Sequence, residues 1–147
     1  MVCLGNICRS PMAHGLLQHK VQQQKRDWEV DSAGTSGYHE GQLPDPRSIA
    51  CMKGHGIDIT YQQSRLITYD DLKEFELVYV MDANNYKDVC NMARTEEQVS
   101  KIRMIMSEVN PDVETDVPDP YYGGDKGFEN VYKMLDIATD KILERYK

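Results

Sequence analysis

A cysteine, an arginine and a serine stand near the start of the chain at a spacing that suits the binding of a tetrahedral anion. The segment Cys3-Leu4-Gly5-Asn6-Ile7-Cys8-Arg9-Ser10 fits the pattern C-x5-R-[ST]. No proline separates the cysteine from the arginine, so each intervening residue can offer its backbone N–H to an anion. Gly5 and Asn6 tolerate the left-handed conformations that such a ring requires. The loop is therefore predicted to bind an anion the size of phosphate.

Two further features would make this loop electrically positive. Residues 10–24 are predicted to form a helix, which would direct its positive N-terminal end at the loop. Arg9 adds a planar fork that can hold two phosphate oxygens. Both fields favour a thiolate at Cys3, and Ser10 can donate a hydrogen bond to it. The predicted chemistry is nucleophilic attack by Cys3 on a phosphate ester. Zinc binding by Cys3 and Cys8 is disfavoured, because no second pair of ligands lies nearby.

An ester leaving group needs a proton, so a carboxylic acid should lie on another loop. Asp119 stands between Pro118 and Pro120, which stiffen it, and a glycine pair follows soon after. An ordinary Asp-Pro turn explains the same residues equally well. Three further acids lie in the same stretch, and the pattern alone does not choose among them: Asp112, Glu114 and Asp116.

Helices and strands are predicted to alternate along the chain. Further helices are expected over residues 46 to 54 or 56, from a capping box at 68–71, after a cap at Asp82, and over 128–145; strands are expected over 28–33, 77–81 and 101–104. This order predicts an α/β fold: a three-layer sandwich with a mostly parallel four-stranded sheet and helices on both faces. Ligands bind beyond the carboxyl ends of such strands. The segments expected there are 3–10, 34–45, the turn at Asp82 and the loop through Asp119.

The strand that leads into Cys3 is the exception, because only Met1 and Val2 precede this residue. Two residues span roughly 7 Å, about a third of a typical strand. This first, central strand therefore looks truncated, which would leave groups on its neighbours unpaired. We expect further residues upstream of Met1. Supply of the strand by another molecule, or a sheet that folds with a gap, are the alternatives.

Composition limits the remaining possibilities. The 147 residues carry a net charge of −7, with 40% hydrophobic and 28% charged residues, which predicts one globular domain over residues 1–147. A negative chain is a poor nucleic-acid binder, and no apolar run is long enough to span a membrane. With four cysteines and no visible signal peptide, the expected location is the reducing cytoplasm.

Five motifs occur in order along the chain: Val2 to Pro11, Asp31-Ser32-Ala33-Gly34, Pro44-Asp45-Pro46-Arg47, Met81-Asp82 and Asp119-Pro120-Tyr121-Tyr122. In these motifs and their spacing the chain resembles the low-molecular-weight protein tyrosine phosphatase family, over essentially its whole length. The resemblance implies that Cys3 forms a phosphocysteine intermediate. Arg9 and the backbone from Leu4 to Arg9 would bind phosphate, and Asp119 would act as general acid and then base.

The resemblance also implies roles for residues around the loop. Ser10 would stabilise the thiolate, and Asn6 and Ser32 would brace the loop. Tyr38, Tyr121 and Tyr122 would wall the cleft with Leu4, although the Tyr121–Tyr122 pair could instead serve packing. Cys8 holds the position of a second cysteine that can form a reversible disulfide with Cys3 under peroxide. The expected partners are phosphotyrosine-containing proteins and inorganic phosphate. No cofactor is expected, and the chain should be a monomer or a weak homodimer.

Two other functions compete with this interpretation. A thiol-dependent arsenate reductase on the same scaffold would need further cysteines, and the middle of the chain offers only Cys90. A non-catalytic phosphotyrosine-binding module would have no need of Cys3, Arg9 and Asp119 together. Cys51 and Cys90 are interpreted as packing residues. The four histidines (His14, His19, His39 and His55) show no metal-binding spacing, so no metal site is predicted.

Overall fold

The computed structural model describes residues 1–147. Its strands are β1 (Val2–Cys3), β2 (Ala33–Gly34), β3 (Val78–Val80) and β4 (Ile102–Met104). Its helices are α1 (Arg9–Gln23), α2 (Pro46–Gly54), α3 (Tyr69–Glu74), α4 (Ala83–Met92), α5 (Glu96–Lys101) and α6 (Asp125–Arg145). Two short 3-10 helices complete the fold, η1 (Ile105–Glu108) and η2 (Pro120–Tyr122). None of the helices combines the length and apolar character needed to cross a membrane.

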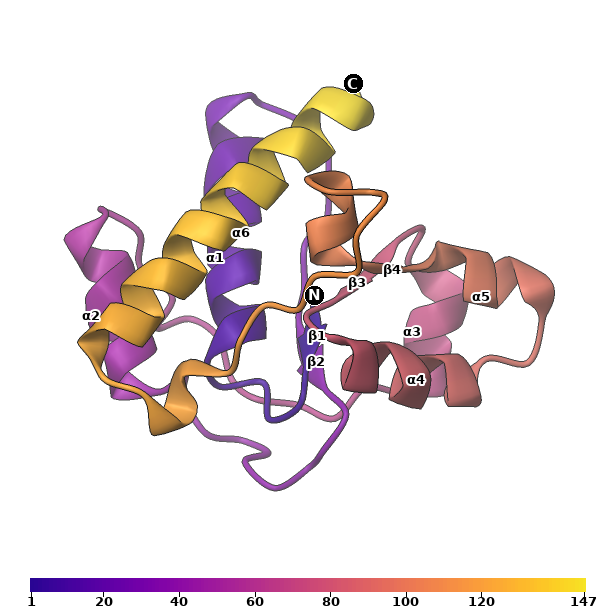
Figure 1. The fold of residues 1–147 in the computed structure, drawn as a ribbon, viewed down its shortest axis with the longest axis horizontal. Helices are drawn as coiled ribbons and strands as arrows, with labels where there is room; N and C mark the ends of the chain where they lie inside the picture. Colours follow the sequence, from indigo (N-terminus) through magenta and orange to yellow (C-terminus); the bar gives the residue numbers. More distant parts are fainter.

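The four strands form one parallel sheet in the order β2-β1-β3-β4. Helices α1, α2 and α6 lie on one side of this sheet, and α3, α4 and α5 lie on the other (Figure 1). The larger apolar core lies on the α1 and α6 side and includes Met12, Leu16, Phe128 and Leu135. A smaller core on the other side holds Leu72 and Val89 against the sheet. The predicted three-layer α/β sandwich is confirmed.

Strand β1 lies in the centre of the sheet although it is only two residues long. Val2 pairs with Ala33 on one side and with Val80 on the other. The predicted short central strand is therefore present, and it ends at Cys3. The sheet thus delivers Cys3 to its carboxyl edge.

Local capping sets where several helices begin. Asp45 accepts the backbone N–H of Arg47 at 2.8 Å, and Asp82 accepts that of Asn85 at 2.8 Å. Thr68 and Asp71 form the predicted capping box of α3. Each cap satisfies N–H groups that a helix leaves without an intrahelical partner. Three helix starts expected from the sequence are confirmed in this way.

The predicted strand over residues 28–33 is wrong except at its end. Only Ala33 and Gly34 pair with β1, because β1 itself offers only Val2 and Cys3 as partners. A strand exists only where a neighbour completes its ladder of hydrogen bonds. Trp28 and Val30 instead pack against the larger core.

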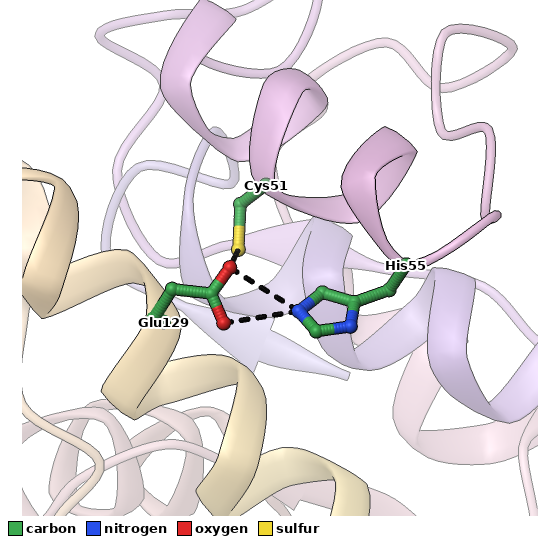
Figure 2. Close-up of side chains that lie close together, drawn as sticks. All are labelled: Cys51, His55 and Glu129. Carbon is green, nitrogen blue, oxygen red and sulfur yellow. Dashed lines mark hydrogen bonds and ion pairs between the residues drawn. The ribbon is translucent and has the colours of Figure 1, made fainter.

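Two other helices differ from expectation. Helix α6 begins at Asp125 rather than at residue 128, and the sequence did not indicate α5, which ends at Lys101 where a strand was expected to start. Helix α2 packs on α6, and there Cys51 and His55 meet Glu129 (Figure 2). Cys51 is only partly buried at the edge of the larger core.

Candidate active site

The loop between β1 and α1 points its carbonyl groups outward. Four of them accept hydrogen bonds from other segments: Cys3 from the Thr35 N–H at 3.0 Å, Leu4 from the Ser36 N–H at 2.9 Å, Gly5 from the Ser64 hydroxyl at 3.0 Å and Ile7 from the Asp45 N–H at 2.8 Å. Because carbonyl and N–H groups of one peptide plane point in opposite directions, this anchoring turns the amides of the loop inward.

The inward amides are available to a ligand. The N–H groups of Leu4, Gly5, Ile7 and Cys8 have no acceptor within the protein. Asn6 occupies the left-handed region with φ of 54°, and its N–H points at the Cys3 sulfur at 3.3 Å. Successive N–H groups arranged in this way form an anion-binding concavity. Phosphate binding by this loop stays a prediction, which the free amides support.

The Cys3 sulfur lies at the base of the ring, and the residue is 3% exposed. Its Sγ lies 3.1 Å from the Ser10 hydroxyl. The oxygen of that hydroxyl already accepts the Asn6 side-chain amide at 2.7 Å. The Ser10 proton is therefore left to donate to Sγ, and such a bond stabilises a sulfur anion.

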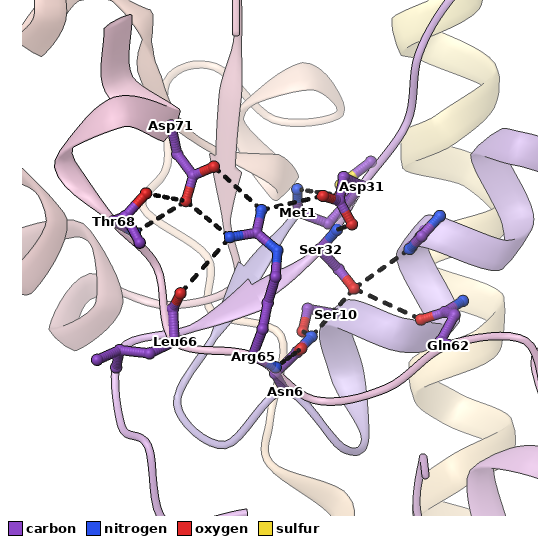
Figure 3. A network of polar contacts seen from close by, with 11 residues as sticks. Met1, Asn6, Ser10, Asp31, Ser32, Gln62, Arg65, Leu66, Thr68 and Asp71 are labelled. Atoms are coloured by element: carbon purple, nitrogen blue, oxygen red, sulfur yellow. Dashed lines mark hydrogen bonds and ion pairs between the residues drawn. The ribbon is translucent and has the colours of Figure 1, made fainter. Parts of the chain in front are cut away.

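A buried polar network fixes the Asn6 side chain (Figure 3). Its amide nitrogen also donates to the Ser32 hydroxyl at 3.0 Å, and its carbonyl oxygen accepts the Arg65 N–H at 3.0 Å. Ser32 in turn lies 3.2 Å from Nδ1 of His14. Burial lowers the pKa of the His14 imidazole to about 4. His14 is a member of this network that the sequence did not indicate.

Gly34 allows β2 to approach the loop closely. A Cβ atom at this position would lie 2.8 Å from the Leu4 carbonyl oxygen and 3.1 Å from the Asn6 backbone nitrogen. Real Cβ atoms do not come that close to backbone, so only glycine fits here without displacing the ring.

Arg9 is held from behind by Asp82 and by the backbone. Its Nη1 donates to Asp82 Oδ2 at 2.6 Å and to the Val117 carbonyl at 2.9 Å. The Arg9 side chain is 4% exposed, and its Nη2 lies 3.8 Å from Oδ2 of Asp119. One end of the fork is therefore occupied by the protein, and the other faces the cleft. The sequence predicts Asp82 as a helix cap near the site, and no local pattern indicates this second contact.

Asp119 is the only one of the four candidate acids that lines the same cleft as Cys3. Its Oδ1 accepts the Tyr121 N–H at 3.0 Å and thereby caps η2, which leaves Oδ2 as the oxygen nearer Arg9. Asp116 instead accepts the Ala83 N–H at 3.0 Å, at the start of α4. Asp112 and Glu114 are exposed.

The cleft has a volume of about 410 Å³. Its lining includes every predicted ring residue except the buried Asn6 and Ser10, together with Asp119 and all three predicted tyrosines. Tyr38 and Tyr122 are 85% and 90% exposed at its rim. Tyr121 lies under the Arg47 guanidinium at 5.3 Å, so it serves both the wall and local packing. Ser36 and His39 also line the cleft, and both belong to segment 34–45, which was expected at this edge of the sheet.

Cys8 is buried beside the same cleft. Burial, followed by the nearby Asp45 carboxylate, raises the pKa of its thiol to about 12. Cys3 and Cys8 are both free thiols. At neutral pH Cys8 is therefore a protonated thiol.

Comparisons with known proteins agree on one family. The family model described as low molecular weight phosphotyrosine protein phosphatase matches residues 1–147. The Homo sapiens protein of that name is 40% identical over 147 residues, which cover 98% of this chain and 92% of the human one.

Solved structures are similar over the same extent. A protein tyrosine phosphatase from Entamoeba histolytica, crystallised with Hepes in its active site, has a TM-score of 0.91 at 36% identity, covering 98% of this chain and 92% of that one. DARP, a Drosophila arginine phosphatase, has a TM-score of 0.92 at 33% identity, covering 99% and 95%. The match over the full length, in sequence and in fold, shows that this chain is a phosphatase and belongs to the low molecular weight phosphotyrosine protein phosphatase family.

Proposed function

We propose that this phosphatase hydrolyses phosphotyrosine in proteins through a phosphocysteine intermediate on Cys3. The observation that carries the proposal is that Cys3, Arg9 and Asp119 line one cleft, with free ring amides around the sulfur. The ring would hold the three non-bridging oxygens of the phosphate, and Arg9 would bind two of them through its free end.

In the first step the Cys3 thiolate attacks phosphorus, and the bond to the tyrosyl oxygen breaks. Asp119 delivers its proton to that oxygen, so the tyrosine leaves as a neutral phenol. In the second step a water attacks phosphorus, Asp119 accepts a proton from it, and the sulfur–phosphorus bond breaks. Inorganic phosphate leaves, and the Cys3 thiolate is restored. The product fits the same ring and is expected to inhibit.

Rapid acid quenching followed by mass spectrometry tests this route. A phosphate adduct on Cys3 is expected during turnover of p-nitrophenyl phosphate. Cys3→Ser should abolish turnover while phosphate still binds, whereas Cys90→Ala, a change in α4 away from the cleft, should keep both. Turnover that survives in Cys3→Ser would exclude the phosphocysteine route.

The aromatic walls of the cleft support a preference for phosphotyrosine. Tyr38, Tyr121 and Tyr122 present ring faces and edges that suit an aryl group. The likeness to a Drosophila arginine phosphatase makes phosphoarginine the instructive comparison. Three peptides that differ only in carrying phosphotyrosine, phosphoserine or phosphoarginine should be compared. The phosphotyrosine peptide should have a higher kcat/KM than both others. A higher kcat/KM for phosphoarginine would contradict the proposed substrate class.

Cys8 would protect the nucleophile under oxidation. Peroxide converts the Cys3 thiolate to a sulfenic acid; the Cys8 sulfur then attacks it, a disulfide forms and water leaves. Support comes from the position of both cysteines in one short loop beside one cleft. After mild peroxide, mass spectrometry should find a Cys3–Cys8 disulfide that dithiothreitol reverses. Sulfonic acid at Cys3 with free Cys8 would refute this role.

Arsenate reduction is the second candidate on this scaffold. It needs additional thiols to receive the oxidation, and Cys90 packs against the smaller core in α4. Turnover of arsenate coupled to thioredoxin should therefore be absent.

A further inference from the structure

Outside the cleft, three side chains of different chemistry converge between α2 and α6 (Figure 2). Cys51 belongs to α2, His55 follows its last residue, and Glu129 belongs to α6. The Cys51 Sγ lies 3.4 Å from Glu129 Oε1, and the His55 Nε2 lies 3.2 Å and 3.0 Å from the two carboxylate oxygens. All three ligand atoms lie within 4.8 Å of one another. Nothing in the proposed phosphatase mechanism uses them.

The spacing explains how one helix end supplies two of these groups. Residues four apart on a helix lie on the same face, so Cys51 and His55 both point toward α6. The sequence pattern indicates Cys51 only as a packing residue, and the four histidines share no metal-binding spacing. Glu129 is 74 residues from His55, a contact that no local pattern indicates.

The donor set matches the preferences of zinc. Thiolate, imidazole and carboxylate are its usual protein ligands, with bonds of about 2.0–2.3 Å. Tetrahedral bonds of that length place ligand atoms about 3–4 Å apart. Two of the three separations already have such values, so a small movement of the Cys51 and His55 side chains would close the site. A thiolate and a carboxylate also balance a doubly charged cation, with the imidazole neutral.

A neighbouring aromatic ring fixes the plane of the imidazole. The Tyr132 ring stacks on His55 with centroids 3.6 Å apart and planes 5° from parallel. In this plane Nε2 lies beside the Glu129 carboxylate, and outer contacts orient metal-bound histidines in a comparable way elsewhere.

We propose that Cys51, His55 and Glu129 form a zinc-binding site with three protein ligands and one open position for water. The metal fastens the C-terminal end of α2 to the first turns of α6. It lies apart from the phosphate ring, so its first effect is on the stability of the fold. A ligand that binds only the folded chain raises the melting temperature in proportion to the logarithm of its concentration above Kd.

Cobalt(II) titration of the full chain tests the site directly. Cys3→Ser serves as the background, because the reactive thiolate in the cleft could itself bind metal. One cobalt per chain is expected, with a sulfur-to-cobalt charge-transfer absorption that equimolar zinc removes. Cys51→Ala should abolish the absorption. Cys90→Ala, a matched change at the other partly buried cysteine, should leave it intact.

Zinc affinity gives a second measurement that does not depend on sulfur. In competition with a chelating dye, Glu129→Gln and His55→Gln should each weaken zinc binding by at least about 100-fold, since loss of even an outer contact costs 10–100-fold. Far-UV circular dichroism should show that both variants are folded. The proposal is overturned if no charge-transfer band forms, if the band survives in Cys51→Ala, or if either glutamine variant binds zinc as tightly as the Cys3→Ser background. Such results would mean that the three side chains are a hydrogen-bonded cluster only.

Discussion

The Arg9 guanidinium donates to the Asp82 carboxylate across 2.6 Å, although 73 residues separate them in the chain. The other oxygen of the same carboxylate caps α4 by accepting the Asn85 N–H at 2.8 Å. One side chain therefore fixes both the start of a helix and the orientation of the Arg9 guanidinium. Asp82 is a positioning residue, since it acts through Arg9.

Asp82→Asn should separate these two tasks. The asparagine oxygen can still cap α4, but the neutral amide loses the charge-assisted bond to Arg9. We expect kcat/KM for p-nitrophenyl phosphate to fall roughly 10- to 100-fold, because a small misplacement near the reacting group costs about that much. Asp88→Asn, on the exposed side of α4, is the matched control and should keep wild-type kinetics. Equal kinetics in the two variants would remove Asp82 from the mechanism.

Asp119→Ala should slow hydrolysis of phosphotyrosine by about 10²–10⁴-fold, the usual effect of losing a general acid. The loss should shrink for p-nitrophenyl phosphate, whose leaving group is stable without a proton. Asp112→Ala removes an exposed acid of the same loop and should have no effect. A loss that does not vary with the leaving group would argue for a binding role instead.

Gly34→Ala should distort the ring, because the new methyl group would meet the Leu4 carbonyl oxygen at 2.8 Å. We expect a loss of about 1–3 kcal/mol in the free energy of unfolding and weaker phosphate binding. Gly54→Ala offers the comparison, since a Cβ atom there meets nothing within 4 Å. Urea unfolding and phosphate titration measure both effects. Tight phosphate binding in Gly34→Ala would show that the ring can yield.

The buried His14 should make the free energy of unfolding depend on pH. Burial lowers its pKa from 6.5 to about 4, so between these values the unfolded chain binds more protons than the folded one. Stability is therefore full above about pH 6.5 and declines as the pH falls toward 4. The charged groups that act on this imidazole are the Met1 amino group, Asp31 and Arg65.

We expect His14 to account for a loss of about 2 kcal/mol in the free energy of unfolding between about pH 7.5 and pH 5. Urea unfolding at both pH values, in the wild type and in His14→Gln, isolates this contribution from other titrating groups. The variant should lose correspondingly less stability over the interval. His19→Gln, a change on the same helix, should behave like the wild type. An identical loss in the wild type and His14→Gln would contradict a neutral, buried His14.

Local chemistry was predictable from the sequence, and long-range contacts were not. The caps at Asp45 and Asp82 could be predicted because a helix cap involves residues only two or three positions apart. The prediction of a strand over residues 28–32 was wrong because pairing depends on a distant partner. That partner, β1, pairs only with Ala33 and Gly34. The contacts of Asp82 with Arg9 and of His14 with Ser32 join distant segments, and no periodicity marks them.

The ring carbonyls are anchored by residues 35, 36, 45 and 64, and this anchoring affects how a substrate binds. The floor of the cleft keeps its shape before any ligand arrives, so almost no chain entropy is lost there on association. Recognition of the leaving group then falls to the rim, where Tyr38 and Tyr122 stand largely in solvent. A fixed base beneath an exposed rim would let separate parts of the molecule set turnover and selectivity.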